Sequence, residues 1–163
     1  MIADRWGVRD DEVTRPYPCD EFVPHPVMAA WRGVTVRAAA DELWRWVGQI
    51  RLAPYSYDWI DNLGQRSPRK LRGLPEPIVG EHFSTGFGRS SGRILAVIPG
   101  QELTGHIAGA TMSYVLVPEA DSVRLLLKVV TGRGRLTAPL LCLGDLVMAR
   151  RQLLNFKTRA EAG

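Results

Sequence analysis

Acidic and aromatic side chains crowd into one short stretch of the sequence, "APYSYDWIDNLG" at residues 53–64. Asp58 and Asp61 are three residues apart, so on a helix they lie on adjacent parts of one face, close to Tyr57. Such a carboxylate pair can transfer protons when burial shifts the pKa of one member. Trp59 adds a large apolar ring to the same stretch. These residues are therefore candidates for a ligand-binding or catalytic site.

The same stretch has the pattern of an amphipathic helix, which needs no catalytic role. Proline is tolerated at the first helical position, and glycine commonly follows the last one, so Pro54 and Gly64 predict the two ends. At about 100° per residue the helix has an apolar and a polar arc. The apolar arc holds Tyr55, Ser56, Trp59, Ile60 and Leu63, and the polar arc holds Tyr57, Asp58, Asp61 and Asn62. The pattern leaves open whether Asp58 and Asp61 face a cavity, Arg150 or water.

Two further motifs resemble catalytic or metal sites, and their context argues against both. "GRSSG" at 88–92 fits the Gly-x-Ser-x-Gly pattern of serine hydrolases, but a nucleophile elbow needs a helix after the serine. The next residues, "RILAVI", predict a strand, so we expect a hairpin at Ser90. His25, His82 and His106 stand apart, without the spacing of a metal site. We therefore predict no metal and no other cofactor.

Three residues outside these motifs are candidates for lining a cavity. Met112 and Tyr114 alternate along a predicted strand, so they share one face and would line a cavity if that face points inward. Arg150 falls within the apolar arc of the last predicted helix, whereas Gln152 and Asn155 fall outside it. An arginine among leucines either extends its head group to the surface or pairs with an acid or an anion inside. We favour the inward arrangement.

The order of predicted elements indicates an α+β fold. Strands are expected at 27–38, 81–87, 93–98, 102–107, 111–117 and 122–131, with turn residues between the later ones. A helix is expected at 39–50, a second at 54–64, and a long helix from Pro139 to about Phe156. A curved antiparallel sheet wrapped around the long C-terminal helix would bury the apolar faces of both.

Residues 1–26 differ from the rest of the chain. They hold three Arg against six Asp and Glu, a net charge of −3, whereas residues 27–163 carry +7. Four prolines in this segment exclude a long helix or a central strand. We predict an extended acidic arm at 1–26, which opposite charge draws onto a basic domain at 27–163.

Composition argues against several classes of partner. The basic residues are dispersed and form no nucleic-acid motif, so we expect no nucleic-acid partner. The longest apolar run, "APLLCLGDLVMA", is too short for a bilayer and contains Asp145, so we expect no membrane insertion. Two unpaired-looking cysteines, Cys19 and Cys142, fit a reduced, cytoplasmic protein. The oligomeric state stays open.

The element order and several local sequences resemble the START-like (SRPBCC, Bet v 1-like) superfamily, and most closely its polyketide cyclase/dehydrase-like bacterial members. The matching text is "PYPCDEFVPHP" (16–26), "WRGVTVRA" (31–38), "LWRWVGQIRLAPYSYDWIDNLGQRSP" (43–68) and "RRQLLNFKTRAE" (150–161). The resemblance implies a helix-grip fold with a cavity for a lipid-like or polyketide-like molecule. Fold alone does not fix function. A cyclase, dehydratase or hydrolase acting in that cavity is one alternative, and a protein-interaction module with a collapsed cavity is another.

Overall fold

A computed structural model describes residues 4–56, 66–86, 89–132 and 138–163. For residues 138–146 only the backbone is described. Six strands form the main sheet in the order β1-β2-β8-β7-β6-β5, and β3 and β4 form a separate hairpin. The strands are β1 (Arg5–Trp6), β2 (Met28–Val36), β3 (Ser84–Gly86), β4 (Arg89–Ser91), β5 (Arg93–Ile98), β6 (Glu102–Ile107), β7 (Ala110–Pro118) and β8 (Val123–Thr131). The helices are α1 (Asp10–Thr14), α2 (Cys19–Phe22), α3 (Ala40–Gly48), the 3-10 helix η1 (Gln49–Arg51) and α5 (Ala138–Ala162).

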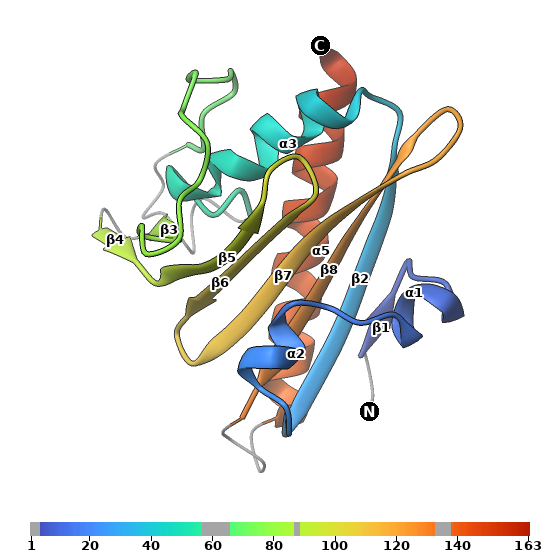
Figure 1. Cartoon of the computed structure of the whole chain (residues 1–163), viewed down its shortest axis with the longest axis vertical. Coiled ribbons are helices and arrows are strands. Elements are labelled where there is room, and N and C mark those ends of the chain that lie inside the picture. The colour runs from blue at the N-terminus through green and yellow to red at the C-terminus, as the bar shows by residue number, and fades with distance from the viewer. Residues whose placement is uncertain (1–3, 57–65, 87–88, 133–137) are drawn as a thin grey trace.

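The main sheet curves around α5, which confirms the predicted α+β, helix-grip architecture (Figure 1). Pairing is antiparallel throughout except at the edge, where β1 runs parallel to β2. With 25 residues, α5 is about 37 Å long at 1.5 Å per residue, enough to cross the whole sheet. None of the helices in the described part is both long and apolar enough to cross a membrane.

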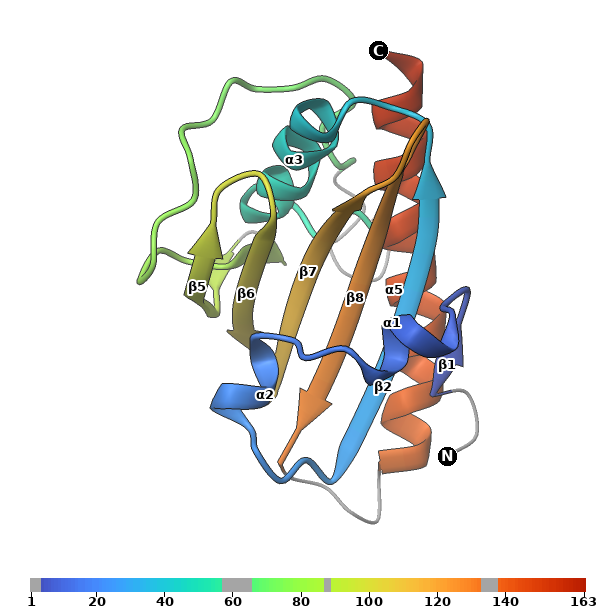
Figure 2. The same ribbon diagram turned by 45° about the vertical axis from the view of Figure 1, so that its right-hand side comes forward.

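Strand β8 is buried on both faces, although its sequence predicted only one buried face. Leu125, Leu127 and Val129 belong to the core between sheet and helix. Arg124 and Lys128 alternate with them, yet all nine residues of β8 are buried. The reason is that the N-terminal segment lies across the outer face, so α1 and α2 stand on one side of the sheet and α5 on the other (Figure 2).

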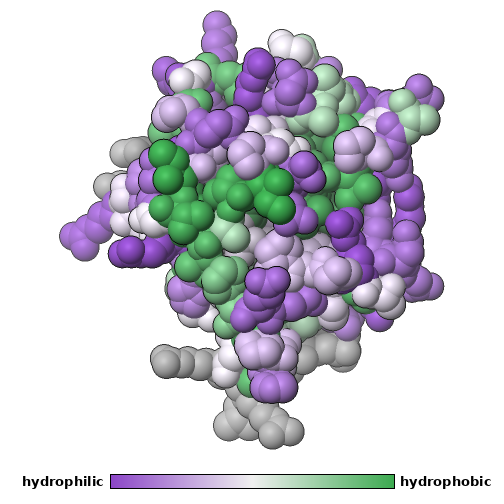
Figure 3. Space-filling model, viewed as in Figure 1, coloured by the Kyte–Doolittle hydropathy of each residue, from purple (hydrophilic) through white to green (hydrophobic). Residues whose placement is uncertain are grey.

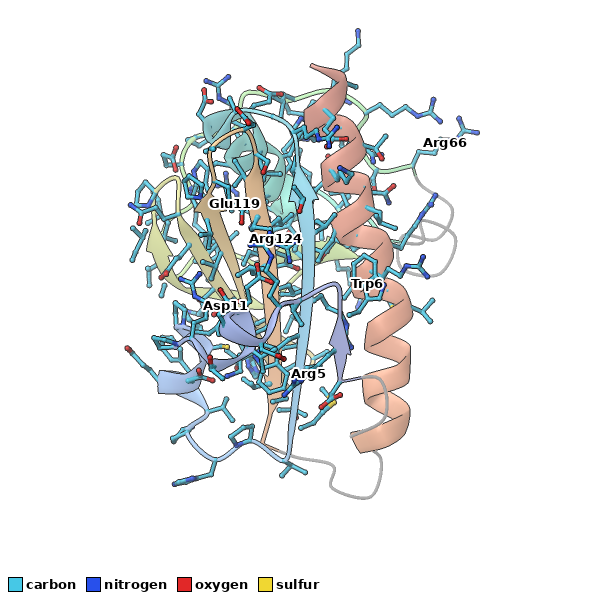
Figure 4. The ribbon with its side chains drawn as sticks, turned by 90° about the vertical axis from the view of Figure 1, so that its right-hand side faces the viewer. Arg5, Trp6, Asp11, Arg66, Glu119 and Arg124 are labelled. Carbon is cyan, nitrogen blue, oxygen red and sulfur yellow. The ribbon has the colours of Figure 1, made fainter. Side chains whose placement is uncertain are left out.

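A buried ion pair fastens α1 to this outer face. Glu12 accepts two hydrogen bonds from Arg124, from Nε and from a terminal nitrogen, both of 2.7 Å. Arg124 also donates to the carbonyl of Gly7. Burial alone would raise the pKa of Glu12, but hydrogen bonds from Arg124 and the Arg9 amide outweigh it and hold the pKa below its usual 4.5. Arg9 adds a more exposed pair with Glu119 at 2.6 Å. Glu119 follows the last residue of β7 and is labelled in Figure 4.

A second buried cation fastens α2. Lys128 donates to Asp20 over 2.6 Å, and its ammonium lies 5.4 Å and 5.1 Å from the ring centres of Tyr17 and Trp31. The backbone amide of Cys19 donates to Ser113, next along the sheet. The acidic residues of the segment therefore meet basic residues of the sheet, as the charge distribution indicated.

The segment at 54–56 corrects the predicted start of the second helix. Residues 54–56 are not helical, and Tyr55 has a left-handed backbone with φ of 54°. Side-chain amides on α5 hold this backbone, since Gln152 donates to the carbonyl of Pro54 and Asn155 to that of Tyr55. The Tyr55 ring packs against Phe156, with ring centres 5.3 Å apart. Pro54 therefore does not begin a helix, and the rest of that predicted helix, at 57–64, lies outside the described residues.

Candidate functional site

A pocket of about 610 Å³ lies between the inner face of the sheet and α5. This volume is ordinary for a small-molecule site. Its lining comprises Ile50, Pro54, Ser56, Phe83, Ser84, Arg89, Ser90, Ser91, Ile107, Ala108, Met112, Tyr114, Leu127, Val129, Met148, Ala149 and Gln152. Two smaller pockets, of about 300 and 470 Å³, lie against the loop at 66–77 instead.

The floor of the pocket is apolar and follows from strand alternation. Met112 and Tyr114 on β7 pair across the sheet with Val129 and Leu127 on β8, so four inward side chains form one surface. Ala149 on α5 faces them. Met112 and Tyr114 therefore share one face, as their alternation predicted, and that face lines the pocket; their role in binding a ligand stays a prediction.

Phe83 forms a wall of the pocket because Gly105 leaves room for its ring. A methyl group added at Gly105 would lie only 2.0 Å from the Phe83 ring. Gly105 pairs with Met112 across the sheet, so the ring covers the sheet next to the pocket floor. The phenylalanine is itself almost fully buried. The width of the pocket at this point therefore depends on a residue without a side chain.

One buried hydrogen bond beside the pocket joins β7 to α5. Tyr114 donates its hydroxyl hydrogen to Gln152 Oε1, and Gln152 Nε2 donates to the carbonyl of Pro54. Gln152 is only 8% exposed, although its place outside the predicted apolar arc indicated a solvent-facing side chain. The buried stripe on α5 runs through Ala149, Leu153, Phe156 and Ala160, and Gln152 lies beside it. Helical spacing alone does not distinguish such a flanking residue from an exposed one.

Arg150 does not face the pocket, which corrects the predicted inward arrangement. Its side chain is exposed, and its guanidinium carbon lies 5.3 Å from the centre of the Trp6 ring. Trp6 belongs to the edge strand β1 and lies against α5 (Figure 4). A cation over an aromatic face is stabilised at the surface without losing its contact with water. Sequence reasoning missed this partner because Trp6 is far away in the chain.

Of the remaining candidate residues, four lie outside the described part of the chain and one, Ser90, lies on a strand. Tyr57, Asp58, Trp59 and Asp61 lie outside the described residues, so their roles stay predictions. Ser90 lies on β4 and is followed by β5, not by the helix that a nucleophile elbow needs.

The histidines outside the pocket occupy ordinary polar positions. His106 is exposed and bonds Thr111, as expected of a satisfied polar residue, and His82 bonds the carbonyl of Arg51. Within the described part of the chain, no three His, Cys, Asp or Glu side chains gather as a metal site would require.

Apolar surface is a weaker candidate than the pocket. Figure 3 shows hydrophobic side chains in a band across the middle of one face, surrounded by hydrophilic ones. Large exposed hydrophobic residues include Ile78, Val79 and Ile98. The segment from Ile78 to Glu81 reaches the outer strand β5, since the amide of Gly80 donates to the carbonyl of Ile94. Nothing in the structure indicates what would cover this band.

Known structures share this architecture. Protein NE0264 from Nitrosomonas europaea is 11% identical, with a TM-score of 0.59 over 83% of this chain and 96% of that one. An AHSA1-like protein from Aeromonas hydrophila is 17% identical, with a TM-score of 0.52 over 81% and 92%. DynU16, a protein in the dynemicin biosynthetic locus, is 18% identical, with a TM-score of 0.52 over 82% and 49%. No protein-family model matches the chain, and neither does any curated protein. At 18% identity or less, these likenesses show the shared fold.

Proposed function

We propose that this protein binds a small apolar or amphipathic molecule, of lipid-like or polyketide-like character, in the pocket between the sheet and α5. The observation that carries the proposal is the volume of about 610 Å³ at the very interface where sheet and helix bury their apolar faces. Protein interiors are close-packed, with few voids larger than a water molecule. A space of this size with an apolar floor favours an apolar occupant.

The chemistry of the lining supports binding more than acid–base catalysis. Its polar groups are serine hydroxyls, the Tyr114–Gln152 pair and one guanidinium, with no carboxylate or imidazole among the described lining residues. The alternative of a cyclase, dehydratase or hydrolase therefore depends on Asp58 and Asp61, which lie outside the described residues. The alternative of a collapsed cavity loses its premise, because a pocket is present.

Native mass spectrometry of the protein purified from its own host tests the proposal. We expect a small-molecule adduct on the wild-type chain. Met112→Trp, which fills the floor of the pocket, should remove the adduct, whereas Ile98→Trp adds the same ring at an exposed site and should retain it. The proposal fails if no mass is bound and no lipid or polyketide of a test panel raises the melting temperature.

A further inference from the structure

Two sets of polar residues in the pocket differ in whether their side chains already have hydrogen-bond partners. In the first set, Tyr114 donates to Gln152, and Gln152 donates to the carbonyl of Pro54. The second set, Ser84, Arg89 and Ser91, comes from the β3–β4 hairpin at one side of the pocket. No described residue forms a side-chain hydrogen bond or an ion pair with any of these three. Unsatisfied groups that line a pocket are the ones for which a ligand can supply the partner.

The register of the hairpin puts the three side chains on one face. Ser84 pairs with Ser91, and Gly86 pairs with Arg89, so strand alternation gives these positions a common side. Thr85 alternates with them and points away, since its hydroxyl donates to the carbonyl of Arg51 over 2.7 Å. Thr85 is also absent from the lining of the large pocket, among the described residues that form it. The hairpin therefore presents the side chains of Ser84, Ser91 and Arg89 to the pocket from one face, while Ser90, which pairs with Thr85, borders the pocket from the other face.

Burial makes Ser84 the informative member of this set. Ser84 is only 5% exposed and borders the pocket. Its hydroxyl has no hydrogen-bond partner among the described residues. Because Ser84 borders the pocket and its hydroxyl bonds to no described residue, that hydroxyl is free to donate to or accept from a ligand in the pocket.

The lack of an acidic partner among the described residues distinguishes Arg89 from two of the buried arginines. Arg51 and Arg124 are paired with Glu81 and Glu12. Arg89 is exposed at the edge of the pocket and has no acidic partner in the described part of the chain. A cation at the mouth of an apolar pocket can hold an anionic group that stays in contact with water, so neither charge is fully desolvated.

We propose that the ligand is an acidic amphiphile whose carboxylate is held by Arg89, Ser84 and Ser91, while its apolar part lies over Met112 and Val129. This inference rests on the proposed function and specifies its ligand. A carboxylate is chosen because a planar guanidinium can hold it through two parallel hydrogen bonds, and because serine hydroxyls donate to the same oxygens.

A head-group series with one tail tests this without changing the protein. Dodecanoate, dodecanol, dodecyltrimethylammonium and dodecyl phosphate are titrated below their micelle concentrations by isothermal calorimetry. We expect dodecanoate to bind roughly tenfold tighter than dodecanol, the range of a charged hydrogen bond, and the cation to bind weakest. Equal affinity for dodecanoate and dodecanol would overturn the inference and leave the proposed function intact. A tenfold preference for the phosphate would overturn the choice of a carboxylate.

Variants then assign the preference to the hairpin. Arg89→Gln should remove the advantage of dodecanoate while dodecanol binds as before. Arg93→Gln is the matched control, because Arg93 is also exposed but lies on the neighbouring strand β5 outside the lining. Ser84→Ala should weaken dodecanoate severalfold, with Arg93→Gln unchanged. Loss of the preference in Arg93→Gln, or its persistence in Arg89→Gln, contradicts the assignment. Failure of every amphiphile to bind rejects this inference and the proposed function together.

Discussion

Gln152 connects three parts of the molecule through one side chain. It accepts from Tyr114 on the sheet and donates to the carbonyl of Pro54 in the segment after η1. Both side chains are buried, so the hydrogen bond between them replaces bonds that each would make to water in the unfolded chain. We expect Tyr114→Phe and Gln152→Met each to lower the free energy of unfolding, and a double-mutant cycle to give a coupling of about 1 kcal/mol. Urea unfolding of the four proteins measures it. If the losses in free energy of the two single variants add up to that of the double variant, the hydrogen bond between Tyr114 and Gln152 contributes nothing to stability.

Gly105 controls the position of a pocket wall. Since a methyl group there would overlap the Phe83 ring, we expect Gly105→Ala to destabilise the protein by about 1–3 kcal/mol and to alter the affinity for any pocket ligand. Gly132→Ala is the control, because its added methyl group would meet only Val23, at an ordinary 3.6 Å. Chemical denaturation compares the two. A loss no larger than that of the control would show that Phe83 moves aside freely.

The sequence predicts the orientation of a side chain correctly where local periodicity determines it. The prediction is wrong where a residue far away in the chain determines the orientation. Strand alternation was enough to put Met112 and Tyr114 on one face. Arg150 was assigned to the interior because the pattern of α5 carries no information about Trp6. No sequence pattern marks Ser84 as unpaired, since a serine within the predicted strand at 81–87 has no feature that indicates whether its hydroxyl finds a partner.

The contact between α1 and β8 should depend on pH in a defined direction. The folded protein holds the pKa of Glu12 below its usual value, so this contribution to stability is present above about pH 4.5 and is lost as the pH falls through the lowered pKa. Glu12→Gln should cost about 3 kcal/mol at pH 7, because Arg124 remains buried without a charge partner. The difference between wild type and variant should shrink below pH 4.5. Denaturation curves at several pH values measure it.

An exposed ion pair between β1 and the same helix is the control for that prediction. Arg5 and Asp10 are 3.4 Å apart, and the Asp10 side chain is fully exposed. Asp10→Asn should therefore leave the free energy of unfolding unchanged within error at any pH. A comparable loss in both variants would assign the effect to general charge on α1, not to the buried pair.

Strands and helices were predicted most accurately where short turns separate regular patterns. The predicted strands at 93–98 and 102–107 match β5 and β6, and the predicted strand at 122–131 begins one residue before β8. Turn residues such as Pro99 and Gly100 act locally, so their positions are visible in the sequence. The left-handed Tyr55 was not visible, because contacts with α5, about a hundred residues later, hold that backbone.

The N-terminal segment, the sheet and α5 form three layers, and the outer layer is attached by more than charge. Tyr17 and Cys19 pack with Val115, Leu126 and Val130 in a second apolar cluster on the outer face. Releasing the segment would expose this cluster and leave two cations of β8 without acidic partners. Those combined costs indicate that the segment unfolds together with the rest of the chain. The division into an arm at 1–26 and a domain at 27–163 remains a prediction. Whether the arm unfolds independently of the domain can be measured.

The Cys19 thiol reports whether the segment detaches by itself. It is fully buried, and burial raises its pKa to about 11, so the folded protein should react very slowly with a thiol reagent. Cys142→Ser leaves Cys19 as the single thiol. We expect labelling in increasing denaturant to give the same free energy of opening as the unfolding followed by tryptophan fluorescence, because the outer layer and the core open in one transition. Glu12→Gln should lower both values equally. Rapid labelling at denaturant concentrations where the fluorescence is still native would show instead that the segment is a separate unit, released while the sheet and α5 stay folded.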